Sequence, residues 1–325
     1  MAASEGLVGC AQLLEWSEAR HGRVVARDFG TGKPPALEPT ASVNATNSAE
    51  ATSSPAHAWP DLAVTRGDDP ARNTATAVAM LGGMSRFVKR GQSVVVKPNI
   101  LSAREPQFGV TTNPQAVATV VRLAWEAGAK SVTVLDRPTA PALPAYTVSG
   151  IQSAVQSVDG TMKVLSARDF ERIAIPQGRA IHDWPMVADV FDADVVINMP
   201  CAKTHGLAGL TLAMKNLMGI LGDSRGAIHQ DFATKITDLA TLVKPQLIVL
   251  DAYRLLVRNG PSGGSLSDVR PGRTCVAGTN MVSVDAYGAT LFGRAPRSVP
   301  YIDLAAIRGL GVADLDRLRI EKRSV

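Results

Sequence analysis

The stretch that most constrains the fold lies at residues 194–222, where a short apolar strand, a glycine-bearing segment and an apolar helix follow one another. The run from Val195 to Met199 has the apolar, β-branched character of a strand buried on both faces, and Pro200 ends it. We predict a loop after this proline, then a helix that ends near Gly219. Such a strand–loop–helix unit is typical of α/β proteins and places a helix N-terminus at the carboxyl edge of a sheet.

The predicted loop carries residues suited to holding an anion: Lys203, Thr204, His205, Gly206 and Gly209. Lys215 interrupts the apolar helix that follows, and a cation in such a helix needs a partner or a function. Free N–H groups and the helix dipole favour negative charge at a helix N-terminus. We therefore predict an anion site here, with His205 and Lys215 as the catalytic candidates. The alternative is a solvated lysine and a structural histidine.

The chain from Asp61 onward alternates short apolar runs with helical patterns. We predict strands at 62–64, 93–97, 131–135, 247–250 and 274–278, and helices at 73–81, 113–127, 235–243 and 283–292. The region 149–192 is less regular, with a helix predicted at 151–158 and strands at 163–165 and 173–175. This spacing favours parallel strands joined by right-handed crossovers. The predicted fold class is α/β, with a largely parallel sheet flanked by helices, in one lobe or two.

Polar residues follow several of these strands at their carboxyl ends: Lys97, Asn99, Asp136 and Asp251. Because parallel strands end at one edge of a sheet, we expect these side chains to converge with the site at 203–209 and to bind an anion there. The competing interpretation for the two aspartates is that each caps the next turn. The loop at 259–264 is a plain turn or a further anion cradle.

Residues 1–58 differ in composition from the rest of the chain. From residue 30 to residue 58 the segment is rich in Thr, Ser, Ala and Pro, with little to bury. We predict a disordered or loosely attached leader with one short helix at 10–20, followed by an α/β domain at 60–325.

Composition narrows the classes of ligand. The chain has 325 residues, of which 46% are hydrophobic, enough for a large core, and its net charge is +5. The basic residues are dispersed, which disfavours nucleic acid as a partner, and a small anionic molecule fits the excess charge. No apolar run reaches the length needed to cross a membrane, so we predict no membrane partner and a cytoplasmic location. The oligomeric state is not predicted.

The cysteines are Cys10, Cys201 and Cys275, and no two lie close in sequence. This spacing excludes a ferredoxin-type iron–sulfur motif and a zinc motif. Cys201 lies in the predicted anion loop, where a small buried hydrophobic role is favoured over that of a nucleophile.

Five segments together resemble a known family, the domain-of-unknown-function family numbered 362: VVVKPNIL, TTNP, NMPCAKTHGLAGLTLAMKNLMGILG, VLDAYRLLVRNGP and SVDAYG. The resemblance extends from about Leu62 to the end of the chain, and the lysine–threonine–histidine block is its most specific part. Some members of that family carry ferredoxin-type cysteines or an export signal, neither of which is present in this sequence. The resemblance implies an α/β domain without implying a reaction.

The order of His205, Lys215 and His229 is similar, more remotely, to that in the nickel-pincer lactate racemases. This likeness implies that Lys215 tethers a cofactor or clamps an anion, that His205 is the acid and base, and that His229 is a metal ligand. It also implies a metal or a bound organic cofactor. The sequence departs from those racemases in lacking the paired glycine–glycine–arginine step before the lysine.

Two functions follow from the residues. The first is an enzyme that acts on a small anionic metabolite by proton or hydride transfer at the α carbon, with His205 as the base. In that enzyme Lys97, Lys203 and Lys215 would stabilise developing negative charge. The second is a non-catalytic module that binds or carries an anion or a cofactor.

Overall fold

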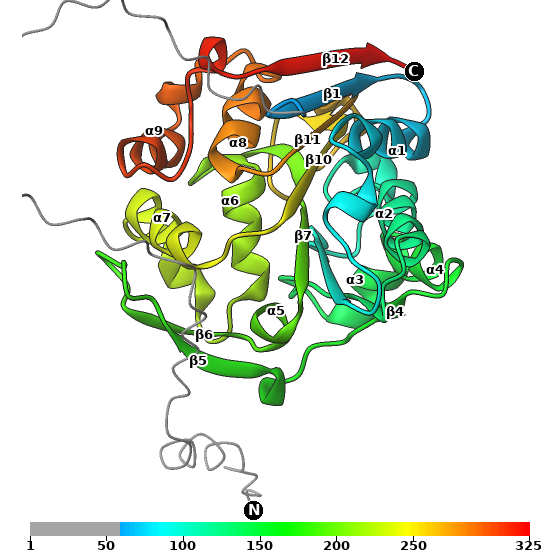
Figure 1. Cartoon of the computed structure of the whole chain (residues 1–325). Helices are drawn as coiled ribbons and strands as arrows, with labels where there is room; N and C mark the ends of the chain where they lie inside the picture. Colours follow the sequence, from blue (N-terminus) through cyan, green and yellow to red (C-terminus); the bar gives the residue numbers. More distant parts are fainter. Residues whose placement is uncertain (1–58) are drawn as a thin grey trace, which may run out of the picture.

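The structure is a computed structural model that describes residues 59–325 (Figure 1). The predicted leader, its helix at 10–20 and Cys10 lie outside the described residues. Within the described part, no helix is both long enough and apolar enough to cross a bilayer.

The strands are β1 (Leu62–Arg66), β2 (Ser93–Pro98), β3 (Ser131–Val134), β4 (Thr161–Met162), β5 (Phe170–Ala174), β6 (Asp183–Val187), β7 (Val195–Met199), β8 (Cys201–His205), β9 (Gly209–Thr211), β10 (Leu247–Leu256), β11 (Val269–Gly278) and β12 (Ile320–Ser324). The α-helices are α1 (Pro70–Met80), α2 (Pro114–Glu126), α3 (Ala142–Val148), α4 (Ile151–Gln156), α5 (Asp189–Asp192), α6 (Ala213–Asn216), α7 (Phe232–Leu242), α8 (Met281–Thr290) and α9 (Pro300–Ile307). Two 3₁₀ segments, η4 (Leu217–Ile220) and η5 (Arg225–His229), follow α6.

One ten-stranded sheet organises these elements, in the order β12-β1-β11-β10-β7-β2-β3-β4, with β8 and β9 continuing beside β10. The run from β10 to β4 is parallel, which confirms the predicted α/β class. β11 differs from the prediction because it pairs antiparallel with both β1 and β10. The chain reaches β11 through the loop after β10 and not through a crossover helix, and a short connection of this kind requires antiparallel pairing.

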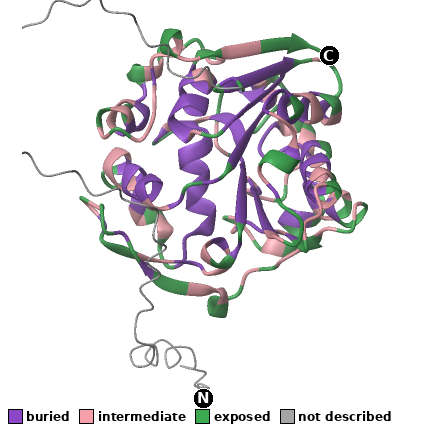
Figure 2. Ribbon diagram, in the orientation of Figure 1, coloured by how far each residue is buried: buried purple, intermediate pink, exposed green. Residues whose placement is uncertain are grey.

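Alternate residues of the central strands face two separate cores. Val94 and Val96 of β2 pack with helices α1 to α4, whereas Val95 packs on the opposite side with α6 to α9. Figure 2 shows the buried residues gathered in these strands and in the helices on either side of them. Because both cores share the same sheet, the described residues form a three-layer α/β unit and not two separate lobes.

Several short elements differ from the prediction. Helix α1 begins before the predicted residue 73, because Asp69 caps it by accepting bonds from the N–H groups of Ala71 and Arg72, and Pro70 occupies its first turn. Residues 163–165 form no strand. The sequence analysis missed α3, α9 and β12, which are too short or too uniformly apolar to show a clear period.

The largest correction concerns the segment after Pro200, predicted as a loop. Cys201–His205 is strand β8, which lies beside β10 and forms a hairpin with β9. The helix after it has a single α turn, α6, before it tightens into η4. Its N-terminus is also already occupied, because the carboxylate of Asp285 on α8 accepts bonds from the N–H groups of Ala213 (2.5 Å) and Met214 (3.0 Å). These two N–H groups are therefore not free to bind an anion, which differs from the expected role of this helix N-terminus.

Candidate functional site

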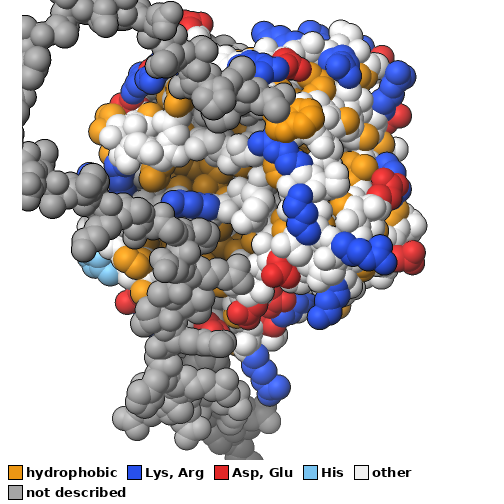
Figure 3. Space-filling model, viewed as in Figure 1, with side chains coloured by type: hydrophobic (Ala, Val, Ile, Leu, Met, Phe, Trp, Pro, Cys, Tyr) orange, Lys and Arg blue, Asp and Glu red, His pale blue; other side chains and the backbone are white. Residues whose placement is uncertain are grey.

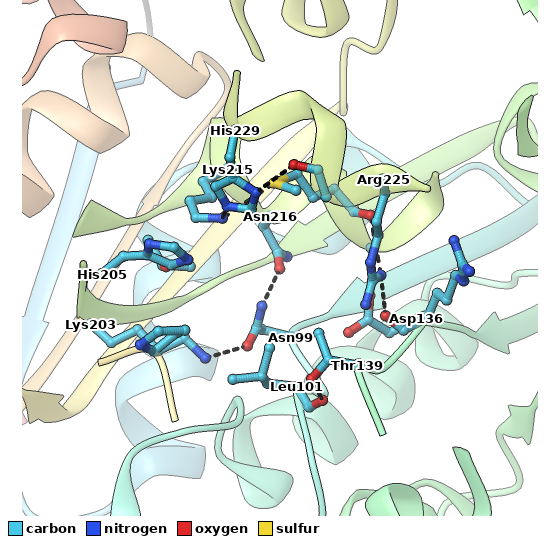
Figure 4. A pocket seen from close by; sticks show the side chains of 16 residues that line it. Asn99, Leu101, Asp136, Thr139, Lys203, His205, Lys215, Asn216, Arg225 and His229 are labelled. Atoms are coloured by element: carbon cyan, nitrogen blue, oxygen red, sulfur yellow. Dashed lines mark hydrogen bonds between the residues drawn. The ribbon is translucent and has the colours of Figure 1, made fainter. Parts of the chain in front are cut away.

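A cavity of about 230 Å³ lies at the carboxyl edge of β2 and β3 (Figure 4). Hairpin β8–β9, the α6–η4 segment and η5 complete its wall. The residues that line it are Asn99, Leu101, Asp136, Arg137, Thr139, Lys203, His205, Thr211, Lys215, Asn216, Met218, Gly219, Arg225, Gly226, His229 and Pro261. The cavity is therefore built from segments more than 160 residues apart in sequence.

Six of the residues singled out from the sequence line this cavity: Asn99, Asp136, Lys203, His205, Lys215 and His229. Lys97 lies directly behind its wall, in contact with Asp136. The expected convergence of strand ends therefore holds for β2 and β3.

The remaining predicted residues do not reach the cavity. Thr204 donates its hydroxyl proton to the carbonyl of Leu256. Gly206 lies in the turn of the β8–β9 hairpin, and Gly209 begins β9, where it pairs with His205. Asp251 is not at a strand end, because β10 continues beyond it to residue 256. Its buried carboxylate accepts the N–H of Asn113, just before α2 (2.7 Å), and the N–H of Tyr253, two residues further along the chain (3.0 Å).

A buried ion pair forms part of the cavity floor. The Lys97 ammonium lies 2.7 Å from Asp136 Oδ1, and both side chains are 3% exposed. Asp136 Oδ2 also accepts the N–H of Ile100 at 2.5 Å. Burial lowers the pKa of Lys97, and the neighbouring carboxylate opposes that shift. Gly219 is required beside this pair, because a Cβ atom there would lie 1.8 Å from Asp136 Oδ1 and 2.4 Å from Lys97 Nζ.

A chain of side-chain hydrogen bonds links the ion pair to Lys203. Lys203 Nζ donates to Asn99 Oδ1 (2.7 Å), and Asn99 Nδ2 donates to Asn216 Oδ1 (2.9 Å), which also accepts from Lys97 Nζ. Asn216 Nδ2 in turn donates to Asn198 Oδ1 (2.8 Å). Each amide has its orientation fixed by its neighbours, so the polar floor is rigid.

Positive charge exceeds negative charge around the cavity. Its lining contains four cations, Lys203, Lys215, Arg137 and Arg225, and one carboxylate, that of Asp136, which is already paired with Lys97. Arg225 donates to the main-chain carbonyls of Arg137 and Pro138, and Arg137 donates to those of Leu221 and Asp223. These bonds position the guanidinium groups without neutralising their charge.

Lys215 has the least polar surroundings of the cavity lysines. Its Nζ lies 3.2 Å from Met218 Sδ, 3.3 Å from His229 Nε2 and 5.2 Å from the centre of the Phe232 ring. Burial, together with the charges of Lys203 and Arg225, lowers its pKa to about 7. Burial likewise lowers the pKa of Lys203 to about 8.

His205 is held in one tautomer. Its Nδ1 accepts hydrogen bonds from the N–H groups of Leu207 (3.1 Å) and Ala208 (3.2 Å), so the proton of the neutral ring is on Nε2. Burial, with the charge of Lys215 next in importance, lowers the His205 pKa to about 3. At neutral pH the ring therefore donates a hydrogen bond through Nε2. This differs from the general base expected from the sequence, since its accepting nitrogen is already occupied.

His229 has the opposite tautomer. Its Nδ1 lies 3.2 Å from the carbonyl of Gly226, which can only accept, so the lone pair is on Nε2 and faces Lys215. The two histidine rings are stacked 5.3 Å apart. The described residues contain no group of three or more His, Cys, Asp or Glu that could hold a metal. His229, predicted as a metal ligand, is therefore not part of such a group, and its role as a ligand stays a prediction.

Thr211 provides an independent sign of a ligand. Its side chain lines the cavity, the residue is 3% exposed, and its hydroxyl has no hydrogen-bond partner among the described residues. A buried polar atom without a partner is rare in a folded protein.

Several cavity residues were missed in the sequence, among them Arg137, Thr139, Asn216 and Arg225. Arg137 and Asn216 directly follow Asp136 and Lys215, so adjacency to a predicted residue was an available signal. No such signal marked Arg225, because its position at the cavity depends on how η5 folds. Pro261 shows that the loop at 259–264, for which a plain turn was one interpretation, reaches the cavity.

Cys201 is buried, its Sγ lies 3.3 Å from the carbonyl oxygen of Gly109, and burial raises its thiol pKa to about 12. This supports the hydrophobic role favoured from the sequence over that of a nucleophile.

The surface outside the cavity has no basic stripe on the face shown in Figure 3, where Lys and Arg side chains lie scattered among acidic and neutral ones. The predicted partner, a small anionic molecule in place of nucleic acid or a membrane, stays a prediction.

Comparisons with known proteins give one family and one relative. The model described as "Domain of unknown function (DUF362)" matches residues 94–290. The chain is 30% identical over 251 residues to the Thylakoid-associated protein sll1697 of Synechocystis sp., a match that covers 73% of this chain and 74% of that protein.

Among solved structures, the chain is similar to a crystal structure of a Thermotoga maritima protein from the Northeast Structural Genomics Consortium. The sequence identity is 12% and the TM-score is 0.37, and the match covers 74% of this chain and 60% of that one.

The close contact at Gly219 makes a testable prediction. Gly219→Ala should lower the free energy of unfolding by about 3–5 kcal/mol, because the new methyl group must separate a buried ion pair. Gly206→Ala is the matched control, since no atom lies within 4 Å of the added carbon, and it should change stability by less than about 0.5 kcal/mol. Urea unfolding of both variants measures the difference. Equal midpoints would show that the ion pair does not depend on this glycine.

Proposed function

The chain belongs to the DUF362 family, whose description names no activity, and we propose from its cavity that it is an enzyme acting on a small organic anion. The ligand would carry a carboxylate or phosphate group, held by Lys203, Lys215 and Arg225. The chemistry would be proton transfer next to that group.

The observation that carries this proposal is the excess of positive charge among the residues that line one cavity. Buried cations repel one another and lose their hydration, so they destabilise a folded protein unless an anion joins them. The side-chain carboxylate in the lining is already paired with Lys97. A bound anion would offset the charge of Lys203 and Lys215 and could accept the free hydroxyl proton of Thr211.

The two histidines support catalysis by their complementary tautomers. His205 can donate a hydrogen bond through Nε2 to an oxygen atom that gains negative charge. The pair of His229 and Lys215 can accept a proton, since the lone pair of His229 Nε2 faces the Lys215 amine and the amine pKa lies near 7. The base expected at His205 is thus reassigned to this pair, and His205 becomes the donor.

The likeness to nickel-pincer lactate racemases stays a prediction. His205, Lys215 and His229 do lie at one cavity, as that likeness requires. His229 Nε2, however, faces the Lys215 amine and belongs to no group of three or more ligating side chains among the described residues, so these residues do not fit a metal held by the protein. We derive no step through a metal. Metal analysis of the purified full chain is the measurement that decides this question.

The cytoplasmic location also stays our prediction. The matched Synechocystis protein is named for its association with thylakoids, and that name describes the relative only. Fractionation of cells that express the full chain, followed by immunoblotting of the membrane and soluble fractions, tests the location directly.

Anion affinity should fall as pH rises. Lys215, with a pKa near 7, and Lys203, with a pKa near 8, lose their protons between pH 6 and 9, and each loss removes an attractive charge. We expect the affinity for oxalate or inorganic phosphate, measured by calorimetry, to fall by about tenfold or more over this interval. Lys215→Arg should keep the affinity and flatten the change near pH 7. An absence of binding for both anions at pH 6 would contradict the proposed function.

Lys215 should also lower the stability of the free protein. Its folded-state pKa lies below the ordinary value of 10.5, so between about pH 7 and 10.5 the unfolded chain binds more protons and stability rises with pH. Lys215→Met removes the buried charge and should raise the free energy of unfolding at pH 7, without added anion, by about 1–4 kcal/mol. The same variant should bind oxalate more weakly. A Lys215→Met protein less stable than the parent would show that the lysine has a structural role.

The assigned role of His205 can be separated from its bulk. His205→Gln keeps an N–H donor, whereas His205→Phe keeps only a ring. We expect the affinity for oxalate to fall about tenfold in the Phe variant, the cost of one lost hydrogen bond, and much less in the Gln variant. Equal losses in both variants would mean that the imidazole itself is needed, which would favour the base role. Unchanged affinity in both would place His205 outside the site and favour the non-catalytic binding module.

A further inference from the structure

We propose that Lys215 is a nucleophile, and that the natural ligand is an anionic aldehyde or keto acid whose carbonyl carbon Lys215 captures as an imine. This inference rests on the proposed function, because the cations of the cavity must first hold the ligand's carboxylate or phosphate.

The first argument is the difference between Lys215 and the other lysines of this region. Lys97 is paired with a carboxylate, and Lys203 donates to the oxygens of Asn99 and Val110. Among the described residues, Lys215 instead contacts a thioether, an imidazole and an aromatic face. These neighbours stabilise an ammonium weakly, so they favour the neutral amine, which is the form that attacks a carbonyl.

The second argument is the position of His229. Its Nδ1 is bound to the Gly226 carbonyl, which leaves Nε2 as a proton acceptor 3.3 Å from the Lys215 nitrogen. A base at hydrogen-bond distance from an amine is what imine formation needs. His229 is itself held by its stacking on His205 and Phe232.

The third argument is that the other cations lie where they can orient the ligand. Lys203 and Arg225 face the same cavity as Lys215, and each is fixed by bonds to neutral oxygens. A ligand whose anionic group meets these cations would present a carbonyl carbon, one or two bonds away, to the amine. His205 Nε2–H is available for the carbonyl oxygen.

The reaction balances without a redox partner. The amine nitrogen bonds to the carbonyl carbon, and His229 takes a proton from the nitrogen. That proton, with the second amine proton, leaves with the carbonyl oxygen as water, and a carbon–nitrogen double bond remains. The product is the imine plus one water, and hydrolysis reverses the step.

Reductive trapping tests this inference. The full chain is incubated at pH 7 with glyoxylate, a small anionic aldehyde, and sodium cyanoborohydride, which converts an imine into a stable carboxymethyl group. Peptide mass mapping then gives the rate at each lysine. We expect Lys215 to react at least about tenfold faster than the exposed Lys89, because the Lys215 pKa lies near the pH of the assay and the cavity holds the ligand beside it. Oxalate should slow labelling at Lys215 alone.

Two variants serve as matched controls. Lys215→Arg keeps the positive charge without the nucleophile, so it should lose the rapid labelling while it still binds oxalate. Lys89→Arg, on the surface, should leave labelling of Lys215 unchanged. Acetaldehyde, which is uncharged, should label Lys215 more slowly than glyoxylate does.

The outcomes separate this inference from the proposed function. Oxalate binding together with labelling at Lys215 no faster than at Lys89 would overturn the imine and leave the anion site standing. Rapid labelling that oxalate does not slow would show a reactive amine without an anion site beside it, which overturns the substrate class. Absence of both binding and labelling would overturn the proposed function with the inference.

Discussion

Lys97 and Asp136 form a buried ion pair at the ends of two neighbouring parallel strands, and the surrounding segments are arranged to satisfy it. Ile100 gives its N–H to the carboxylate, Asn216 gives its side-chain oxygen to the ammonium, and Gly219 leaves the space that the pair occupies. A buried pair of charges is costly to desolvate and is tolerated only where further hydrogen bonds complete it. Those bonds fix the turn after α6 against the edge of the sheet. With η4 held in this position, Met218 and Gly219 form part of the cavity wall.

Three buried lysines near this edge form a series. Lys97 contacts a carboxylate, and Lys203 contacts an amide oxygen and a carbonyl. Within residues 59–325, the Lys215 ammonium contacts sulfur, an imidazole and an aromatic ring. Burial lowers the pKa of all three, and the partners decide how far the protein compensates. The series therefore runs from a cation with a carboxylate partner to an amine whose pKa lies near 7. The three lysines are similarly buried but have different partners. One region can therefore contain both a lysine that stays charged and a lysine that changes protonation near neutral pH.

The sequence predicted the parts of this arrangement that depend on local pattern. Apolar runs that end in Lys97 or Asp136 belong to parallel strands, and parallel strands end together, so their convergence followed from the chain alone. Asp251 has the same local pattern but lies inside a longer strand. Asp251 pairs with Cys275 of β11, a strand that the chain reaches only after a loop. No local sequence pattern reveals this pairing. Residues 201–205 read as a loop because their pairing partners lie in β9 and, more than 40 residues away, in β10. Asp285 shows the same limit, since it caps a helix that begins 72 residues before it.

Main-chain atoms determine which ring nitrogen carries the proton in His205 and in His229. Two N–H groups of the hairpin turn take the lone pair of His205, and one carbonyl of η5 takes the proton of His229. The rings are neighbours, yet one is left as a donor and the other as an acceptor. Neither assignment follows from residue type, and both follow from where the backbone turns. The hairpin and the 3₁₀ segment thus do more than connect elements: they set opposite proton positions on two stacked rings. A ligand that both accepts from one ring and gives a proton to the other would match the cavity in charge and in hydrogen bonding at once.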